Sequence, residues 1–276
     1  MPKAIVEAEQ LLEDLGFDKV PVIPEKVCKA MSSQQYQITI EEKALSSEKF
    51  HGISMGNIFG ATILVNSNIP NRHRKRFTAA HELAHVHLHI QTNRKSKFQC
   101  TAEDISLGDG NNDSFEKEAN QFASALLMPA SIISPIIHKN GLSWALVEKI
   151  RKLCDVSLEA AARRTIALSK ESCCLIIHKQ GTMWNPIKSD AFNIYLPTQN
   201  FPSFLYTDSD KNGSQPLPDN MEECDFSDWS FPDKACTGQL YYSSILNNEF
   251  DRRMTLLLHQ EDACEDDMEL DELNFS

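Results

Sequence analysis

Residues 74–89 read RKRFTAAHELAHVHLH and are the most informative stretch in the N-terminal part of the chain. They have a helical pattern and contain His81-Glu82-Leu83-Ala84-His85, a run of the form HExxH. On a helix, residues four apart lie about 40° from each other around the axis, so both imidazoles point the same way. Such a pair can bind one metal ion, and zinc accepts neutral imidazole nitrogen. Glu82 would lie beside the ion, where its carboxylate can take a proton from a bound water.

A site of this kind needs a third protein ligand. A metzincin would have Gly at position 88 and His at position 91, but the chain has Leu88 and Gln91, which excludes that class. The alternative is a carboxylate on a second helix, and the helix predicted from residue 113 or 114 to 128 offers Glu116 and Glu118.

Helical spacing favours Glu118 over Glu116 as that ligand. Ala119 belongs to the apolar stripe of the predicted helix, and Glu118 adjoins it, whereas Glu116 points about 200° away from Glu118 around the axis. We therefore predict His81, His85 and Glu118 as metal ligands and Glu82 as the catalytic base.

The other patterns in the first 130 residues predict a small sheet beside helices, which is an α+β fold. A helix is expected over residues 4–15, and a second short helix follows the proline-rich turn at 21–24. Strands are expected at 36–40, 51–55 and 58–65, the last two joined as a hairpin at Gly56-Asn57. Residues 90–113 are polar and predict no regular element.

The remaining residues divide into a helical region and a strand-rich region. Residues 130–170 are helical throughout, with breaks at 141–142 and 155–157, and Ser157 is an N-cap residue before the last helix. Strands are then expected at four places, separated by a stretch rich in Pro, Asp and Ser at 197–235, and the acidic run 261–276 predicts a disordered tail. The four expected strands are 173–178, 192–196, 240–245 and 254–259.

The charge of the chain lies almost entirely in its C-terminal third. Of 27 basic and 39 acidic residues among 276, residues 1–172 hold 21 and 20, and residues 173–276 hold 6 and 19. Residues 130–172 hold 7 basic and 4 acidic residues, well short of a strongly basic DNA-reading face. The balance of -12 argues against direct DNA binding.

Segment hydropathy and cysteine spacing give two further expectations. No apolar run approaches the roughly 18 residues of a membrane helix, and Met1-Pro2-Lys3 leads into an amphipathic pattern, so we expect a soluble, cytoplasmic protein without a membrane partner. The cysteines include no CxxC pair, so we expect reduced thiols without a role in metal binding. They are Cys28, Cys100, Cys154, Cys173, Cys174, Cys224, Cys236 and Cys264.

Two separated motifs resemble the ImmA/IrrE family of zinc metallopeptidases. They are 63–66 (ILVN) with 76–85 (RFTAAHELAH), and 118–120 (EAN) with 122–123 (FA) and 126–129 (LLMP). The resemblance covers roughly residues 4–130 and implies a zincin-like domain in which His81, His85 and Glu118 bind zinc and Glu82 is the general base. Ala84 stands where many members have Gly. Members typically cleave a partner helix-turn-helix repressor in stress or mobile-element responses.

The resemblance also implies a domain plan. We expect a zincin-like peptidase domain over 1–129, a helical, helix-turn-helix-like module over 130–172, a mixed α/β domain over 173–260 that is GAF-like and serves sensing or interaction, and the acidic tail 261–276. The predicted function is zinc-dependent, site-specific cleavage of a helix-turn-helix transcriptional repressor. The alternative is a regulatory binding protein that uses the zinc fold as a docking platform. The sequence leaves the substrate and the oligomeric state open.

Overall fold

The structure is a computed structural model that contains two compact units. One comprises Met1–Lys139 with Val147–Arg164, and the other Asn140–Leu146 with Thr165–Ser276. The described residues are 2–45, 47, 49–105, 113–179, 182–183, 186–196, 217–218, 220–229, 237–247 and 252–261.

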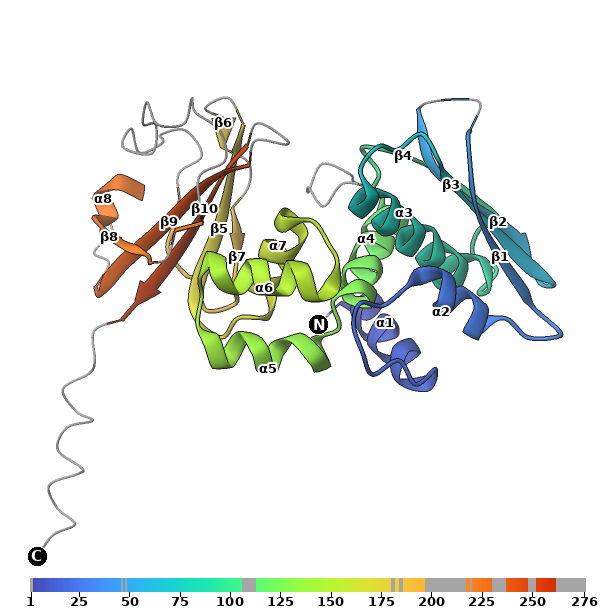
Figure 1. Cartoon of the computed structure of the whole chain (residues 1–276), viewed down its shortest axis with the longest axis horizontal. Helices are drawn as coiled ribbons and strands as arrows, with labels where there is room; N and C mark the ends of the chain where they lie inside the picture. The colour runs from blue at the N-terminus through green and yellow to red at the C-terminus, as the bar shows by residue number, and fades with distance from the viewer. Residues whose placement is uncertain are drawn as a thin grey trace, which may run out of the picture. The chain divides into compact units, whose positions relative to one another are not determined.

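The first unit contains a four-stranded sheet covered by helices (Figure 1). Its strands run in the order β1-β3-β2-β4, with β1 and β3 parallel and the other pairs antiparallel. Helix α3 packs against β2 and β3, α4 packs on α3, and α1 packs on α4. The elements are α1 (Lys3–Asp14), α2 (Pro24–Met31), β1 (Gln37–Lys43), β2 (Phe50–Asn57), β3 (Gly60–Asn66), α3 (Arg72–His85), the π-helical turn η1 (Val86–Ile90), β4 (Lys97–Thr101) and α4 (Ser114–Leu127).

The predicted hairpin is present, but its turn lies two residues later than expected. Asn57 pairs with Gly60, so the loop consists of Ile58 and Phe59, and the Asn57 side chain accepts a hydrogen bond of 2.8 Å from the Phe59 amide. Gly56 lies within the strand. A larger residue does not fit there, because a Cβ would come within 2.4 Å of the Gly60 carbonyl oxygen. The glycine that indicated a turn is required by close strand packing instead.

The sequence missed strand β4, which lies inside the polar stretch 90–113. Its neighbour β2 pairs with it in antiparallel register, and Phe98 and Cys100 are buried while Gln99 between them is exposed. Two inward residues are too few for the alternation to stand out among polar neighbours. This short strand forms one edge of the sheet.

Both helices that carry the candidate ligands begin at side-chain caps. Asn71 accepts from the Arg74 amide at 2.9 Å before α3, and Asp113 accepts from the Phe115 amide at 2.9 Å before α4. Each cap satisfies an amide that has no partner within its helix. Residues 86–90 then continue α3 as a π-helical turn, so the predicted helix over 74–89 is confirmed with an altered last turn.

The three helices after α4 follow the predicted breaks. Gly141 and Asp155 both have positive φ, and the Ser157 side chain accepts a hydrogen bond from the Ala160 amide at 3.2 Å. Helix α5 and most of α6 and α7 lie in the first compact unit, whereas 140–146 lie in the second. The separate helical module predicted over 130–172 stays a prediction. The helices are α5 (Ala130–Asn140), α6 (Trp144–Cys154) and α7 (Leu158–Leu168).

The helices of the described part of the chain are short. No single helix there is long and apolar enough to cross a membrane. Helices α4 and α5, which are bent by 68° at the break between them, meet the test of length and composition only when taken together.

The second unit contains an antiparallel sheet with the strand order β6-β5-β10-β9-β8, and β7 also pairs with β5. Three of the predicted strands are confirmed as β5, β9 and β10, but 192–196 does not pair as a strand. Its residues Phe192, Ile194 and Leu196 nevertheless contribute to the core, and this burial gives the strand-like alternation. Most of 197–235, and 262–276, lie outside the described residues. The elements are β5 (Ser172–Lys179), β6 (Thr182–Met183), β7 (Ile187–Lys188), β8 (Glu222–Cys224), α8 (Phe226–Trp229), β9 (Gln239–Asn247) and β10 (Arg252–Gln260).

Arg164 joins α7 to the peptide segments around α1 and α4. Its guanidinium is buried, donates to the Met128 carbonyl at 3.0 Å and pairs with Glu9 at 3.1 Å. Replacing Arg164 with Ala should lower the free energy of unfolding by about 3 kcal/mol, because the buried Met128 carbonyl and the Glu9 carboxylate each lose a donor. Lys152→Ala, at an exposed ion pair, should cost less than about 1 kcal/mol. Urea unfolding of both variants measures this, and equal effects would contradict it.

Candidate metal centre

The HExxH residues lie on the part of α3 that is buried on all sides. Every residue from Phe77 to His85 is buried, and the side chains of His81, Glu82 and His85 have no exposed surface. Since α3 lies between the sheet and α4 (Figure 1), polar groups on it can be satisfied only by neighbouring elements.

Helix α4 brings Glu116, not Glu118, to the two histidines. Oε2 of Glu116 lies 3.0 Å from Nε2 of His81 and 3.2 Å from Nε2 of His85, and the two Nε2 atoms are 3.1 Å apart. Cys100 from β4 joins the group, with its Sγ 3.4 Å from Nε2 of His85. One potential ligand atom from each of these four buried residues lies within 4.8 Å of all the others.

These separations fit a single tetrahedral ion. Bonds of about 2.0–2.1 Å to nitrogen and oxygen and about 2.3 Å to sulfur hold ligand atoms roughly 3.3–3.6 Å apart. The distances of 3.0–3.2 Å among the ligand atoms of His81, His85 and Glu116, and of 3.4 Å between Cys100 Sγ and His85 Nε2, are close to these edges. The residues present therefore fit a metal of the zinc type.

The preferred sequence candidate, Glu118, lies elsewhere. Its Oε2 is 3.1 Å from Nε2 of His89 and 2.9 Å from Nη1 of Arg94. Helical spacing places Glu118 next to the apolar stripe of α4, but the face toward α3 carries Glu116 and Asn120, one helical turn apart. The spacing Glu-x-x-x-Asn was the signal that could have identified this face.

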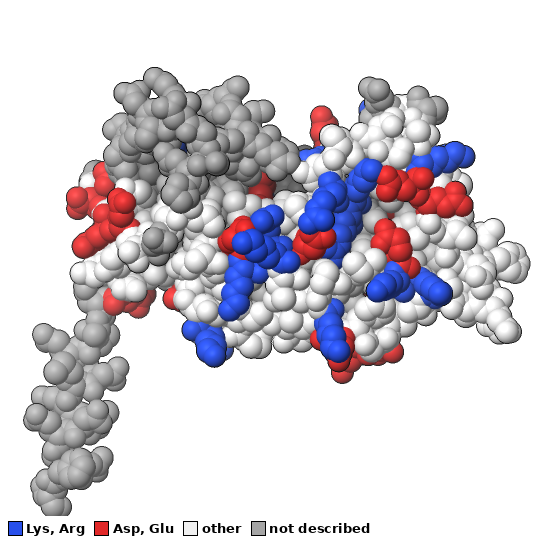
Figure 2. Space-filling model, in the orientation of Figure 1, with Lys and Arg blue, Asp and Glu red and all other residues white. Residues whose placement is uncertain are grey.

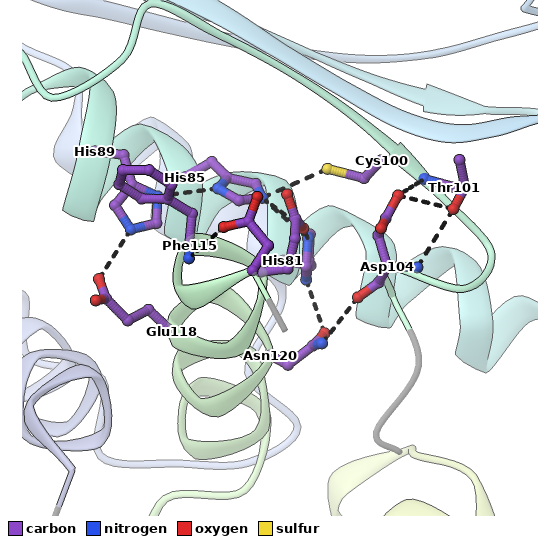
Figure 3. A network of polar contacts seen from close by, with 11 residues as sticks. His81, His85, His89, Cys100, Thr101, Asp104, Phe115, Glu118 and Asn120 are labelled. Atoms are coloured by element: carbon purple, nitrogen blue, oxygen red, sulfur yellow. Dashed lines mark hydrogen bonds and ion pairs between the residues drawn. The ribbon is translucent and has the colours of Figure 1, made fainter. Parts of the chain in front are cut away.

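The outer nitrogens of both histidines have partners that orient the rings (Figure 3). Oδ1 of Asn120 accepts from Nδ1 of His81 at 2.9 Å, and Nδ2 of Asn120 donates to the Asp104 carbonyl at 2.9 Å. Nδ1 of His85 lies 3.0 Å from Nδ1 of His89, whose Nε2 reaches Glu118. When each Nδ1 donates outward, each Nε2 lone pair is free to face an ion.

Burial and hydrogen bonding give the candidate ligands suitable charges. Burial lowers the pKa of His85 to about 3, so its imidazole is neutral at physiological pH. Although burial alone would raise the pKa of Glu116, the contacts with His81 and His85 hold it below its ordinary range, so the carboxylate is ionised. Neutral imidazole and ionised carboxylate are the forms that bind a metal.

Glu82 lies beside the candidate ligands. Burial raises its pKa to about 7, and the neighbouring His81, Ser54 and Cys100 offset only part of this effect. Neither of its carboxylate oxygens has a hydrogen bond of ordinary geometry among the described residues. A Cβ at Gly52 on β2 would come within 2.3 Å of Oε1, so a glycine is required there. A carboxyl group with this pKa can accept and return a proton near neutrality.

Comparisons with known proteins concern the family and the fold of the chain. Residues 33–165 match the family profile of the IrrE N-terminal-like domain. A solved structure described as a Mycobacterium tuberculosis transcriptional regulator is similar with a TM-score of 0.57 and 12% identity, over 94% of this chain and 88% of that chain. At this identity the similarity concerns the fold alone. No curated protein matches the chain.

Substitution of the two carboxylates on α4 distinguishes their roles. Glu116→Gln should weaken zinc binding by roughly 100-fold or more, because an ionised ligand is lost, whereas Glu118→Gln should weaken it by at most about tenfold, since Glu118 acts through His89. Competition with a colorimetric zinc chelator measures both affinities. A larger loss of zinc affinity in Glu118→Gln than in Glu116→Gln would indicate that Glu118 is the ligand.

The raised pKa of Glu82 predicts a pH-dependent stability in the metal-free chain. Because the folded-state pKa of about 7 exceeds the ordinary 4.5, the bound proton stabilises the fold fully below pH 4.5, and this contribution is lost as the pH rises through about 7. Relative to wild type, metal-free Glu82→Gln should therefore gain about 3 kcal/mol in unfolding free energy between about pH 4.5 and about pH 8.5. Urea unfolding at both pH values measures the difference, and a constant difference would contradict it.

Proposed function

Since the chain carries an IrrE N-terminal-like domain and so belongs to the ImmA/IrrE family of metallopeptidases, we propose that it is a zinc-dependent endopeptidase that cleaves a partner protein at a specific site. The observation that carries the proposal is the convergence of His81, His85 and Glu116 beside the buried carboxyl group of Glu82. In this proposal Glu116 takes the ligand position first expected of Glu118.

Each residue of the site has one task in the proposed reaction. His81, His85 and Glu116 would hold zinc, which supplies an acidified water and polarises the scissile carbonyl when bound. Glu82 accepts a proton from the attacking water and passes it to the leaving amide nitrogen. Asn120 and His89 keep the two imidazoles in the tautomers that the ligands require.

The proposed substrate is a helix-turn-helix transcriptional repressor, and the setting is a stress or mobile-element response in the cytoplasm, where such a regulator acts. The family resemblance of the two sequence motifs supports this choice. The matching solved structure is itself described as a transcriptional regulator, which is compatible with a regulatory setting.

Ion pairs near the start of α3 support a protein partner over direct DNA binding. Arg72 pairs with Asp155, Arg76 lies 3.1 Å from Asp155, and Lys75 pairs with Glu42. Figure 2 shows acidic side chains interspersed among the basic ones on the face in view. Basic groups already paired with carboxylates offer less charge to phosphates.

One observation favours the second candidate, a regulatory binding protein that uses the zinc fold as a docking platform. Cys100 would complete four protein ligands, and closed four-ligand sites are typical of structural zinc. The two candidates differ in their dependence on Glu82, because docking needs the folded metal site but no proton acceptor.

The conservative variant Glu82→Gln tests the proposed activity. It should retain zinc and reduce cleavage by about a thousandfold or more, because the proton acceptor is lost while the ligands remain. Wild type and variant are incubated with the helix-turn-helix regulator encoded nearest to the gene and with a host-cell extract, and new protein N-termini are quantified. New N-termini that form equally with both proteins would contradict a peptidase.

A further inference from the structure

Strand β4 presents two side chains to the metal centre. The Phe98 ring stacks on the His85 imidazole at 3.9 Å between centroids and 14° between planes. Two residues along, on the same face, the Cys100 thiol lies 3.4 Å from Nε2 of His85 (Figure 3). Cys100 is fully buried, so its position is set by the sheet and not by solvent.

The thiol is part of the candidate ligand group and not merely near it. Its Sγ is one of the four potential ligand atoms that lie within 4.8 Å of one another, and 3.4 Å is close to the nitrogen–sulfur edge of a tetrahedral zinc site. The proposed reaction uses His81, His85, Glu116 and Glu82 and gives the thiol no task. A peptidase zinc keeps one position for water beside three protein ligands, and a sulfur bound to the same ion as His81, His85 and Glu116 would take that position.

We propose that Cys100 is a fourth ligand of the metal, held in the position that the attacking water requires, so that the metal-loaded chain rests in a latent form. The inference rests on the proposed function. On binding, the thiol loses its proton to solvent and a sulfur–metal bond forms; activity requires that bond to open.

The location of Cys100 suits a ligand that can leave. β4 is an edge strand that pairs only with β2 among the described strands, and Cys100 pairs with Gly52, the residue that makes room for Glu82. Displacement of β4 would move Cys100 while α3 and α4, which carry His81, His85 and Glu116, keep their packing. Such a displacement would free the water position beside Glu82.

Cobalt replacement tests the bond without relying on activity. The full-length wild-type chain loaded with Co²⁺ should show a near-ultraviolet thiolate-to-cobalt charge-transfer band, which Cys100→Ser should lose while keeping visible cobalt bands. Cys28→Ser, at a buried thiol on α2, is the matched control and should keep the charge-transfer band. The same band in Cys100→Ser, or its absence from cobalt-loaded wild type, would overturn the proposal.

X-ray absorption at the zinc edge of wild type needs no variant and covers the case in which Cys100→Ser fails to fold. One sulfur neighbour at about 2.3 Å is expected, and a shell of nitrogen and oxygen alone would refute the fourth ligand.

Cleavage rates test latency separately from ligation. At saturating zinc, Cys100→Ser should cleave roughly tenfold or more faster than wild type, since only molecules without the sulfur–metal bond are competent. An equal rate in both would refute latency, and absence of cleavage in both would refute the proposed function while the cobalt spectrum still decides the ligand.

Discussion

The second half of α3, from Phe77 to His85, is buried on all sides, so its polar side chains can be satisfied only by neighbouring elements. The helix carries His81, Glu82 and His85 with no exposed surface, and each buried polar group without a partner costs about 1–3 kcal/mol. The imidazoles of His81 and His85, on consecutive turns of a buried helix segment, therefore require partners from other elements. The candidate metal centre consists of those partners: Glu116 and Asn120 from α4 and the thiol of Cys100 from β4.

The same constraint explains features that look independent along the chain. Gly52 has no side chain because the Glu82 carboxyl group occupies that space, and Phe98 stacks on His85 because β4 closes the sheet beside it. His89, in the π-helical turn after α3, links His85 to Glu118. Glu118 is therefore connected to the centre through two imidazoles, and its place in the EAN motif does not require direct metal contact.

The candidate metal centre takes its side chains from two kinds of element. Three come from helices α3 and α4, and the fourth, Cys100, comes from the edge strand β4. Helices α3 and α4 pack along their lengths and hold His81, His85 and Glu116 together. Among the described strands β4 pairs only with β2, and in our proposal its Cys100 is the ligand that separates from the metal. In our proposal, therefore, His81, His85 and Glu116 keep the metal bound while movement of β4 lets water reach it.

Local sequence was sufficient for the elements whose signal lies within a few residues. It predicted the helix with His81 and His85, the helix after Asp113, the hairpin, the breaks near Gly141 and Asp155, and three strands of the second unit, because periodicity, caps and glycines act over short distances. It also indicated the family, now matched over 33–165.

Tertiary packing decided which of Glu116 and Glu118 lies beside the two histidines, the position of Cys100 next to them and the existence of β4. A helical wheel gives the angles between side chains but not the direction in which the helix faces, and that direction is set by how α4 packs on α3. Cys100 is 15 residues from His85 in the chain, and only the pairing of β4 with β2 brings them together.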